Sequence, residues 1–403
     1  MKIKFYKNPE RIGGGITEMQ YAGHRLIIDM GANLPKIGEK NEEKFEANPQ
    51  IEGLTTGNGN CDGVLITHYH GDHVGLLSYV LPNIPVYMTR TARDVLSLVY
   101  GKLQLAGLGN RVKETLEHLQ QTEIFTSDHY GRYQQVGVFQ VMPLRVDHSA
   151  YDALMYLVKV GGKKVLFTGD FRNHGYTGKR ILEMLEKYVG KVDCLIIEGT
   201  MLGSRGHEVT ITEDELAHKA IDLCTKYPYV LYLASSTNID TQMSFYRAAK
   251  VTGKKFCPDD FQKKVLAVVA QNATTDFYKP ELKSKGSGHG LVIPVRLGHD
   301  LGMVQGFFRK FRDKSVLVYC LWEGYLKENA ELYKLSQTIG ERFIKLHSGG
   351  HAFQSLIKDV IATCATSDTL VVPMHTENMA AFDELQTGCR IIKLQQEEEL
   401  EMP

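Results

Sequence analysis

Residues 64–73 read Val-Leu-Ile-Thr-His-Tyr-His-Gly-Asp-His, an apolar run followed by a cluster of histidines and an aspartate. The apolar part is typical of a buried strand, so we expect the polar part in the loop at the carboxyl end of that strand. Alternate residues of extended chain point the same way, and His68 and His70 can therefore reach one cation together. Asp72 and His73 come on the next turn of chain, where they can serve a second cation.

A pair of metal ions is the simplest reason for this clustering. Three histidines and one aspartate within six residues would be costly to bury together without a cation. Imidazole and carboxylate groups suit Zn²⁺ or Mn²⁺. We therefore predict two divalent ions, with Zn²⁺ as the expected metal and Mn²⁺ as the alternative.

The run resembles the signature of the metallo-β-lactamase superfamily. That resemblance implies four further residues, each of which follows an apolar run: Asp29, His148, Asp170 and His375. In the family the first of these braces the metal loop, and the other three are ligands. The implied ligand set is His68, His70 and His148 for the first ion, Asp72, His73 and His375 for the second, and Asp170 as the bridge.

Three later motifs resemble the β-CASP branch of the superfamily, whose members act on nucleic acids. Glu198, in Ile-Ile-Glu-Gly-Thr, fits the acidic A motif; His351 and His375 fit the B and C motifs. A histidine at the C-motif position resembles the RNA-processing members, since DNA-processing members tend to carry an apolar residue there. One departure from ribonuclease J-like chains is that the B-motif serine stands at Ser348, and Gly349 takes its usual place.

The same resemblance implies how the site would work. Two cations bridged by a carboxylate generate a hydroxide nucleophile from water near neutral pH and offset the charge of the transition state. Asp72 is expected to contribute to catalysis as a ligand. His351 would give a proton to the leaving ribose oxygen, oriented by Glu198 as a carboxylate–imidazole pair. The alternative for His351 is a purely structural role.

The pattern of elements predicts an α/β protein with two parts. The first 200 residues alternate apolar strands with turn signals, and the resemblance implies the αββα sandwich of the metallo-β-lactamase fold. From about residue 208 a β-loop-α-β order begins, which resembles a nucleotide-binding-like α/β unit with a parallel sheet. We interpret 206–340 as an inserted β-CASP domain between segments 1–205 and 341–403 of the metallo-β-lactamase domain.

Hydrophobic periodicity gives the individual elements. The predicted strands are 25–29, 63–67, 85–89, 136–146, 154–160, 164–169, 194–198, 229–234, 254–257, 315–320 and 369–372. The predicted helices are 74–81, 91–107, 177–188, 213–226 and 240–251.

Two segments of the insertion are candidates for RNA contact. Ser235, Ser236 and Asn238 lie at a strand-to-helix turn, where backbone N–H groups and hydroxyls can bind phosphate, although ordinary N-capping explains them too. Residues 307–314 interleave phenylalanines with basic residues, a pattern that suits base stacking or an amphipathic helix with a solvated basic face. The remaining candidate substrate contacts are His347 and Ser348 of the B motif.

Composition excludes several classes of protein. Over 403 residues, 43% are hydrophobic and 23% charged, as in ordinary globular domains. No run of about 18 apolar residues and no apolar signal core are present, so we expect neither a membrane span nor export. The seven scattered cysteines lack C-x-x-C pairs and predict reduced thiols in the cytoplasm. The net charge is zero, so attraction to RNA must come from local patches and the metals.

The leading hypothesis is a metal-dependent ribonuclease that cleaves single-stranded RNA as an endonuclease, a 5′-to-3′ exonuclease or both. The alternative is a metallo-hydrolase of another substrate, either DNA or a small ester, thioester or lactam. The insertion argues against a small substrate, because a small pocket needs no such lid. A non-catalytic binding subunit should have lost ligands, whereas all seven are present. RNA is the expected partner, and whether the chain forms a homodimer is left open.

Overall fold

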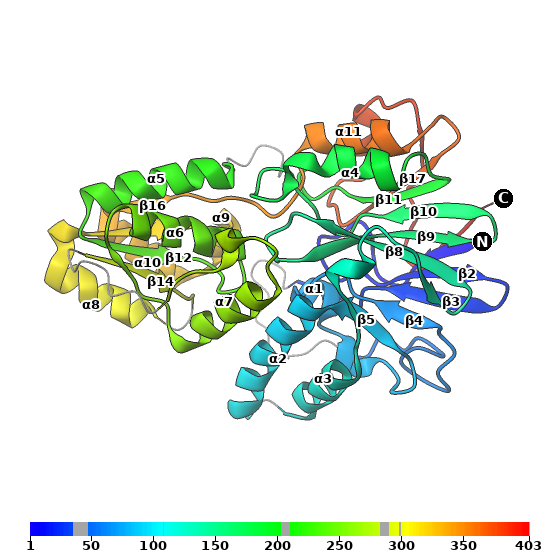
Figure 1. Cartoon of the computed structure of the whole chain (residues 1–403), viewed down its shortest axis with the longest axis horizontal. Helices are drawn as coiled ribbons and strands as arrows, with labels where there is room; N and C mark the ends of the chain where they lie inside the picture. The colour runs from blue at the N-terminus through cyan, green and yellow to red at the C-terminus, as the bar shows by residue number, and fades with distance from the viewer. Residues whose placement is uncertain (35–46, 108, 203–209, 283–289, 298–299, 403) are drawn as a thin grey trace.

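The computed structural model describes residues 1–34, 47–107, 109–202, 210–282, 290–297 and 300–402. These residues form two seven-stranded sheets that stack face to face and a five-stranded sheet that lies beside them (Figure 1). The two chain ends lie together at the far end of the stacked sheets, where the last strand pairs with the first.

The two stacked sheets each combine an antiparallel part with a parallel part. The first contains, in spatial order, β19 (Glu399–Glu401), β1 (Lys2–Phe5), β2 (Thr17–Tyr21), β3 (His24–Ile28), β4 (Gly63–Leu65), β5 (Val86–Thr89) and β6 (Glu123–Phe125). The second contains β18 (Arg390–Ile391), β17 (Leu370–Met374), β11 (Cys194–Glu198), β10 (Lys163–Phe167), β9 (Ala153–Val160), β8 (Phe139–Val146) and β7 (Gln134–Val136). In the parallel parts, the carboxyl ends of neighbouring strands share one edge.

Alternating apolar side chains explain why four layers form. Leu65 of β4 packs between the two sheets with Ile28 and Phe167, whereas Val64 and Ile66 pack on the outer face of the first sheet. Both outer faces are covered by helices: α2 (Arg90–Leu105) and α3 (Gly109–Gln121) on the first sheet, α4 (Ile181–Tyr188) and α11 (Gln354–Cys364) on the second. This is the predicted αββα sandwich.

The third sheet is entirely parallel and has helices on both faces, as predicted for a nucleotide-binding-like unit. Its strands are β13 (Lys255–Phe256), β14 (Leu291–Val295), β12 (Tyr229–Leu233), β15 (Ser315–Tyr319) and β16 (Phe343–Lys345). Its helices are α5 (Glu213–Lys226) and α6 (Ile239–Val251) on one face, and α8 (Leu301–Phe311), α9 (Glu323–Glu328) and α10 (Ala330–Ile339) on the other. The boundaries 206 and 340 stay predictions: residue 206 lies outside the described residues, and β16 pairs with β15 just beyond 340.

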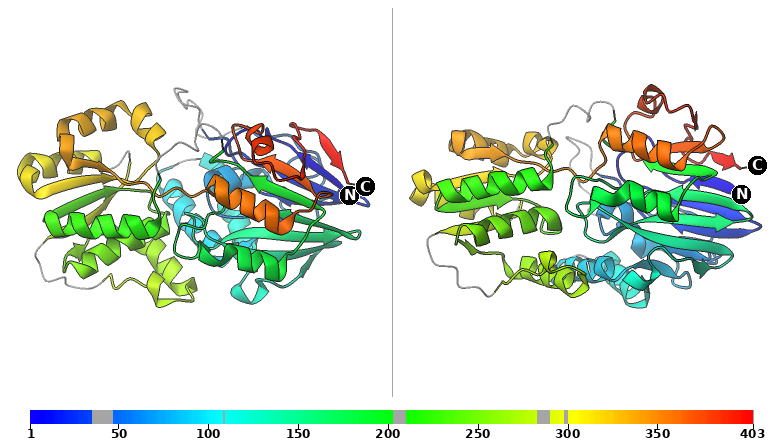
Figure 2. Two further views of the ribbon diagram at one scale, coloured as in Figure 1. Left: turned by 90° about the horizontal axis from the view of Figure 1, so that it is seen from above. Right: turned by 45° about the horizontal axis from the view of Figure 1, so that its top comes forward.

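The third sheet is joined to the first by a shared hydrophobic core. Helix α7 (Asp260–Asn272) packs against α2, and its Val265 and Leu266 belong to the same apolar cluster as Val95 and Leu96 (Figure 2). This continuous core fixes the third sheet beside the metal loops.

Two predicted elements are wrong in detail. The helix predicted at 74–81 is instead α1 (Gly71–Val74) and a separate 3-10 turn, because the Leu76 amide donates to the Met30 carbonyl at 2.8 Å and leaves the helical pattern. The strand predicted at 136–146 is a hairpin, since Gly137 has φ +55° and turns the chain between β7 and β8.

The remaining short helical segments connect the main elements. They are η1 (Leu77–Tyr79), η2 (Ser127–His129), η3 (Gly178–Arg180), η5 (Asp276–Tyr278), η6 (Arg312–Lys314), η7 (Gly340–Arg342) and α12 (Ala381–Glu384). Residues 307–314 fall on α8 and η6, where the Phe307 and Phe311 rings pack on Tyr229, as in an amphipathic helix. Among the described residues, no helix is both long and apolar enough to cross a membrane.

Candidate metal centre

The metal loop follows β4 and is held in place by the end of β3. Asp29 has φ +64° and accepts hydrogen bonds from the backbone N–H and the hydroxyl of Thr67, at 2.8 and 2.9 Å. A side chain at Gly31 would place its Cβ only 1.8 Å from the carbonyl oxygen of Asp72, so glycine is required there. The loop therefore approaches β3 closely, and Asp29 lies where it can brace the loop.

One group of three imidazoles comes from this loop and from the end of β8. The Nδ1 atom of His70 lies 3.1 Å from Nε2 of His68 and 3.2 Å from Nε2 of His148. These nitrogen atoms converge tightly enough to bind a single cation. The structure thus brings together the three residues that the sequence assigns to the first metal.

A second group comes from the loop and from the end of β17. His375 Nε2 lies 3.4 Å from Asp72 Oδ2, and His73 Nε2 lies 3.9 Å from the same oxygen. Asp170, which follows β10, lies between the groups: its Oδ2 is 3.2 Å from His73 Nε2 and 4.0 Å from both His68 Nε2 and His148 Nε2. The predicted bridging carboxylate is therefore in reach of both groups.

Two buried atoms in this centre have no hydrogen-bond partner among the described residues. They are Nε2 of His73 and Oδ1 of Asp170, and both residues are at most 3% exposed. Buried polar atoms are almost always paired, because leaving one unpaired costs roughly 1–3 kcal/mol. Both residues belong to groups whose ligand atoms lie close together, so the donor set fits divalent cations.

Three of the candidate ligand histidines, His148, His73 and His375, are oriented through their Nδ1 atoms. Nδ1 of His148 donates to the carbonyl oxygen of Gly350 at 2.6 Å, and Nδ1 of His73 donates to Asp29 Oδ2 at 2.8 Å. Thr200 donates its hydroxyl proton to the carbonyl oxygen of His375, so Nδ1 of that ring donates to the hydroxyl at 2.8 Å. Such contacts fix the tautomer that presents Nε2 to a metal.

The environment sets the charge of these groups. Burial lowers the pKa of His68 well below its ordinary value and that of His70 to about 4, which keeps both rings neutral, as a metal ligand must be. Burial also lowers the pKa of His73, but the carboxylates of Asp170 and Asp29 outweigh it and raise that pKa well above normal. In the metal-free protein, His375 and the charged His73 hold the pKa of Asp170 well below its usual range, against the effect of burial.

His351 and Glu198 form the predicted carboxylate–imidazole pair beside this centre. Nδ1 of His351 lies 3.2 Å from Oε2 of Glu198 and 3.7 Å from Oδ2 of Asp170. Glu198 is fully buried, whereas the His351 side chain is 22% exposed. Burial lowers the pKa of His351, but the two carboxylates raise it to about 9. The ring therefore carries a proton at neutral pH.

The predicted phosphate-binding turn lies next to the first ligand group. Asn238 forms a β-bridge with Ala150, and its side chain accepts from the backbone N–H of Thr241 at 3.3 Å, as an N-cap of α6 does. The hydroxyl of Ser236 is buried without a hydrogen-bond partner among the described residues. Ser235 is exposed. Asn238 is thus the N-cap of α6, as one of the two interpretations predicted, whereas Ser235 and Ser236 do not cap the helix.

The other two candidate substrate contacts, His347 and Ser348, form hydrogen bonds with other groups of the protein. Nδ1 of His347 donates to the carbonyl oxygen of Cys320 at 3.1 Å. Ser348 is 2% exposed, and its hydroxyl accepts from the guanidinium of Arg172 at 3.3 Å. The displaced serine of the B motif is therefore turned inward rather than toward the metal groups.

Three polar residues of the site were not found from the sequence. Thr200 orients His375, His174 donates from Nε2 to the carbonyl oxygen of Gly349 at 2.9 Å, and Arg172 lies at the centre of a buried ion cluster. No spacing pattern in the sequence marks these three residues, and only their contacts in the fold identify them.

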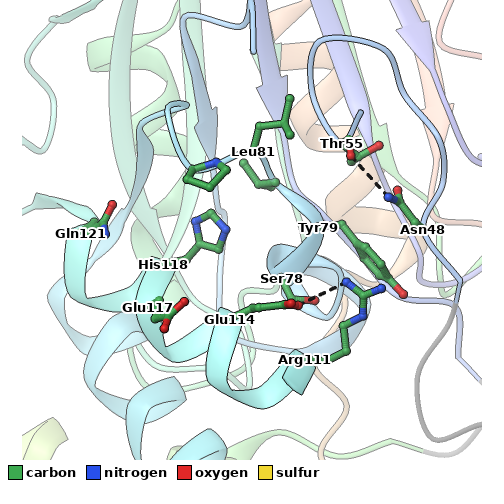
Figure 3. A pocket seen from close by; sticks show the side chains of 12 residues that line it. Asn48, Thr55, Ser78, Tyr79, Leu81, Arg111, Glu114, Glu117, His118 and Gln121 are labelled. Atoms are coloured by element: carbon green, nitrogen blue, oxygen red, sulfur yellow. Dashed lines mark hydrogen bonds and ion pairs between the residues drawn. The ribbon is translucent and has the colours of Figure 1, made fainter. Parts of the chain in front are cut away.

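The larger of two described cavities is not the metal centre. It has a volume of about 300 Å³ and lies between α3 and the turn after η1, where Arg111 stacks 3.7 Å above the ring of Tyr79 and pairs with Glu114 (Figure 3). None of the predicted site residues lines it. A smaller cavity is lined by His73 and His375 and by residues near the N-terminus of the chain.

Comparisons with known proteins agree with this geometry. Residues 34–231 match the model of the β-lactamase superfamily domain. Ribonuclease J of Mycobacterium tuberculosis is 28% identical over 164 residues, covering 40% of this chain and 26% of that protein. Transcription termination factor FttA of Methanothermobacter thermautotrophicus is 26% identical over 208 residues, covering 49% and 30%. Endoribonuclease ysh1 of Schizosaccharomyces pombe is 24% identical over 210 residues, covering 50% and 26%.

These matches span less than a third of each relative's length. A solved structure, that of a protein of unknown function from Enterococcus faecalis V583, shares the fold over 99% of both chains, with a TM-score of 0.73 and 14% identity. The superfamily model covers the metal loop and the Asp170 strand, and the named relatives include ribonucleases. Residues 34–231 therefore form a domain of the β-lactamase superfamily, and the chain is similar to the ribonucleases among the relatives named above.

Proposed function

We propose that the chain is a metal-dependent ribonuclease that hydrolyses phosphodiester bonds of single-stranded RNA. The observation that carries the proposal is that Asp170 lies between two groups of candidate ligands, with its Oδ2 3.2 Å from His73 Nε2 and 4.0 Å from His148 Nε2. The RNA substrate is supported by the ribonucleases among the relatives and by the parallel α/β unit beside the centre.

The geometry supports a definite assignment of ligands. His68, His70 and His148 would hold one ion through the three converging nitrogen atoms. The other ion would be held by Asp72, His73 and His375, and Asp170 would serve both. Nitrogen and carboxylate donors favour Zn²⁺, with Mn²⁺ as the alternative.

A pair of divalent ions, when bound, lowers the pKa of water and offsets negative charge on a phosphodiester. The protein supplies the remaining groups. Glu198 holds Nδ1 of His351, which leaves Nε2 of that ring available to donate a proton to the leaving oxygen. The raised pKa, about 9, keeps His351 in the protonated form that an acid requires.

The RNA would lie against the inserted domain, for which we keep the bounds 206–340. The turn that contains Ser235 and Ser236 adjoins Ala150, two residues from His148, and precedes the N-terminus of the 13-residue helix α6. Hydroxyls and backbone N–H groups there can bind a phosphate next to the scissile bond. Because the net charge is zero, we expect few phosphate contacts and a modest dependence of binding on salt.

The direct test is a cleavage assay with metal-reconstituted protein. The substrates are a 5′-monophosphate RNA, the corresponding 5′-triphosphate RNA and single-stranded DNA of the same sequence. We expect cleavage of RNA in preference to DNA. Mononucleotides from the monophosphate RNA alone would indicate a 5′-to-3′ exonuclease, and internal fragments would indicate an endonuclease.

A matched variant removes the contribution of contaminating nucleases. Asp170→Asn keeps the size of the side chain but removes the shared negative charge, so cleavage should disappear in a preparation made in parallel. Equal rates on RNA and DNA would contradict the RNA preference. Failure of the wild type to cleave either polymer after reconstitution with Zn²⁺ or Mn²⁺ would contradict the nuclease assignment.

A further inference from the structure

Arg172 is the largest side chain among those that are almost completely buried, and its exposed fraction is 0%. Each nitrogen of its guanidinium donates to an acceptor. Nε lies 3.2 Å from Asp147, Nη2 lies 2.7 Å from Asp240, and Nη1 lies 2.8 Å from the carbonyl oxygen of Gly349 and 3.5 Å from Glu213. A planar guanidinium can make all these contacts at once, whereas a lysine ammonium is a point charge on a flexible stem.

The acceptors come from segments that are far apart in the sequence. Asp147 precedes His148 directly at the end of β8. Gly349 lies in the B-motif loop that leads to His351. Glu213 opens α5 and Asp240 lies in the first turn of α6, so both belong to helices of the third sheet. One guanidinium therefore joins the second sheet, the B-motif loop and the inserted unit.

The B-motif loop connects Arg172 to His148, a candidate ligand of the first group. The carbonyl oxygen of Gly349 accepts from Arg172, and the next carbonyl oxygen, that of Gly350, accepts from Nδ1 of His148. A Cβ at Gly350 would lie 2.7 Å from Cε1 of His148, so the loop backbone rests directly on the ring. Arg172 thus constrains His148 from two sides, through Asp147 and through this loop.

We infer that Arg172 is a positioning residue that couples the seating of the inserted unit to the orientation of His148. The part of this inference that concerns metal binding rests on the proposed function, in which His148 is a metal ligand. Asp240 is the residue of the inserted unit that contacts the guanidinium most closely. Its loss should therefore disturb the first ligand group, although none of the predicted metal ligands contacts it among the described hydrogen bonds and ion pairs.

The test compares four variants of the full chain. Arg172→Gln removes the charge, and Arg172→Lys keeps the charge but not the fork of donors. Asp240→Asn weakens the contact from the side of the inserted unit. Asp214→Asn is the matched control, because Asp214 lies next to Glu213 in the first turn of α5 but pairs with the exposed Lys179 at 2.7 Å.

The first readout is the affinity for Zn²⁺, measured by competition with a chromogenic chelator. His148→Ala identifies which of the two Zn²⁺-binding steps depends on the first ligand group, because it abolishes that step. We expect the Zn²⁺ affinity of the same step to weaken by about 10- to 100-fold in both Arg172 variants. Asp240→Asn should weaken the same step by roughly 2- to 30-fold. Asp214→Asn should leave it unchanged. A purely structural arginine predicts instead that Arg172→Lys restores wild-type affinity.

The second readout is amide hydrogen exchange in metal-free protein, which keeps the inference independent of the proposed function. We expect faster exchange in 347–351 for Asp240→Asn and for any Arg172 variant that folds, and wild-type exchange for Asp214→Asn. Equal exchange in 347–351 for the wild type and Asp240→Asn overturns the inference, whatever the metal content. Wild-type protein that binds no metal would overturn the proposed function, and the exchange data would then decide the coupling alone.

Discussion

Two clusters of buried polar side chains lie side by side in the molecule, one around Asp170 and the other around Arg172. In the first, Nε2 of His73 and Oδ1 of Asp170 have no hydrogen-bond partner among the described residues. In the second, all three nitrogens of Arg172 donate, and Asp240 receives further hydrogen bonds from Tyr278 and Tyr176. Only Phe171 separates their centres in the sequence.

The difference shows how a fold separates a binding centre from its support. Donor atoms that converge without protein partners are suited to an external cation, since a cation supplies the missing interaction. A guanidinium that is saturated by protein acceptors has no capacity left for a ligand. The Asp170 cluster is therefore the candidate for chemistry, and the Arg172 cluster is the candidate for holding its geometry.

The largest expected effect follows from changing the Asp170 cluster. Asp170→Asn should reduce ribonuclease activity by about 10³-fold or more, because the shared carboxylate serves both ligand groups. The melting temperature of the metal-free protein should also fall, because Asp170 offsets the positive charge of the buried His73 side chain when no metal is bound. Exposed Asp368→Asn is the control. An active Asp170→Asn protein would mean that the proposed centre does not perform the reaction.

His351 tests whether the pair beside the metal centre does chemistry. His351→Ala should retain both metals and RNA binding but lose about 10²- to 10⁴-fold in rate, because the leaving oxygen has lost its proton donor. The loss should shrink for a p-nitrophenyl phosphodiester, whose leaving group needs no proton. Equal losses on both substrates, with a lower melting temperature, would instead give His351 a structural role.

Arg172→Met tests the supporting cluster through stability. The change leaves buried carboxylates without their cation, so the free energy of unfolding should fall by about 3–5 kcal/mol. Urea denaturation at pH 7 measures the change, and Arg180→Met is the control because the Arg180 side chain is 82% exposed. A loss below about 1 kcal/mol, as at a surface ion pair, would contradict a supporting role.

The smallest effect concerns pH. Burial raises the pKa of Glu213 to about 7, although Arg172 opposes this rise. A carboxyl group with a raised folded-state pKa binds its proton more tightly in the folded state, so its contribution to stability falls as the pH rises from about 4.5 to about 7. Glu213→Gln should therefore gain stability relative to the wild type over this window. Parallel stability curves for the two proteins would contradict the raised pKa.

Strand patterns predicted a sheet-rich α/β protein, and the family resemblance implied its four-layer sandwich. Val64, Leu65 and Ile66 alternate between two hydrophobic layers, and each candidate ligand follows a strand. The family resemblance implied which residues are ligands, and their positions after strands agree with it, since the ends of parallel strands gather at one edge. The convergence of the seven side chains is consistent with that assignment.

Other features depended on contacts between distant segments. A lone arginine has no spacing signal, and only the fold reveals that Arg172 meets Asp147, Glu213 and Asp240. The helix predicted at 74–81 failed because its apolar residues are buried on several sides, so periodicity did not distinguish a helix from a packed turn. Helix α3 was missed although Val112, Thr115 and Leu119 form a buried stripe at helical spacing.

Metal content tests the central claim most directly. The protein is reconstituted with excess Zn²⁺, desalted and measured by elemental analysis. The wild type should contain about two equivalents, as a centre with a shared carboxylate requires. His148→Ala and His375→Ala should each retain about one, because they belong to different ligand groups. A wild-type protein that retains at most one equivalent, or equal loss of all metal in both variants, would contradict two ions that share Asp170.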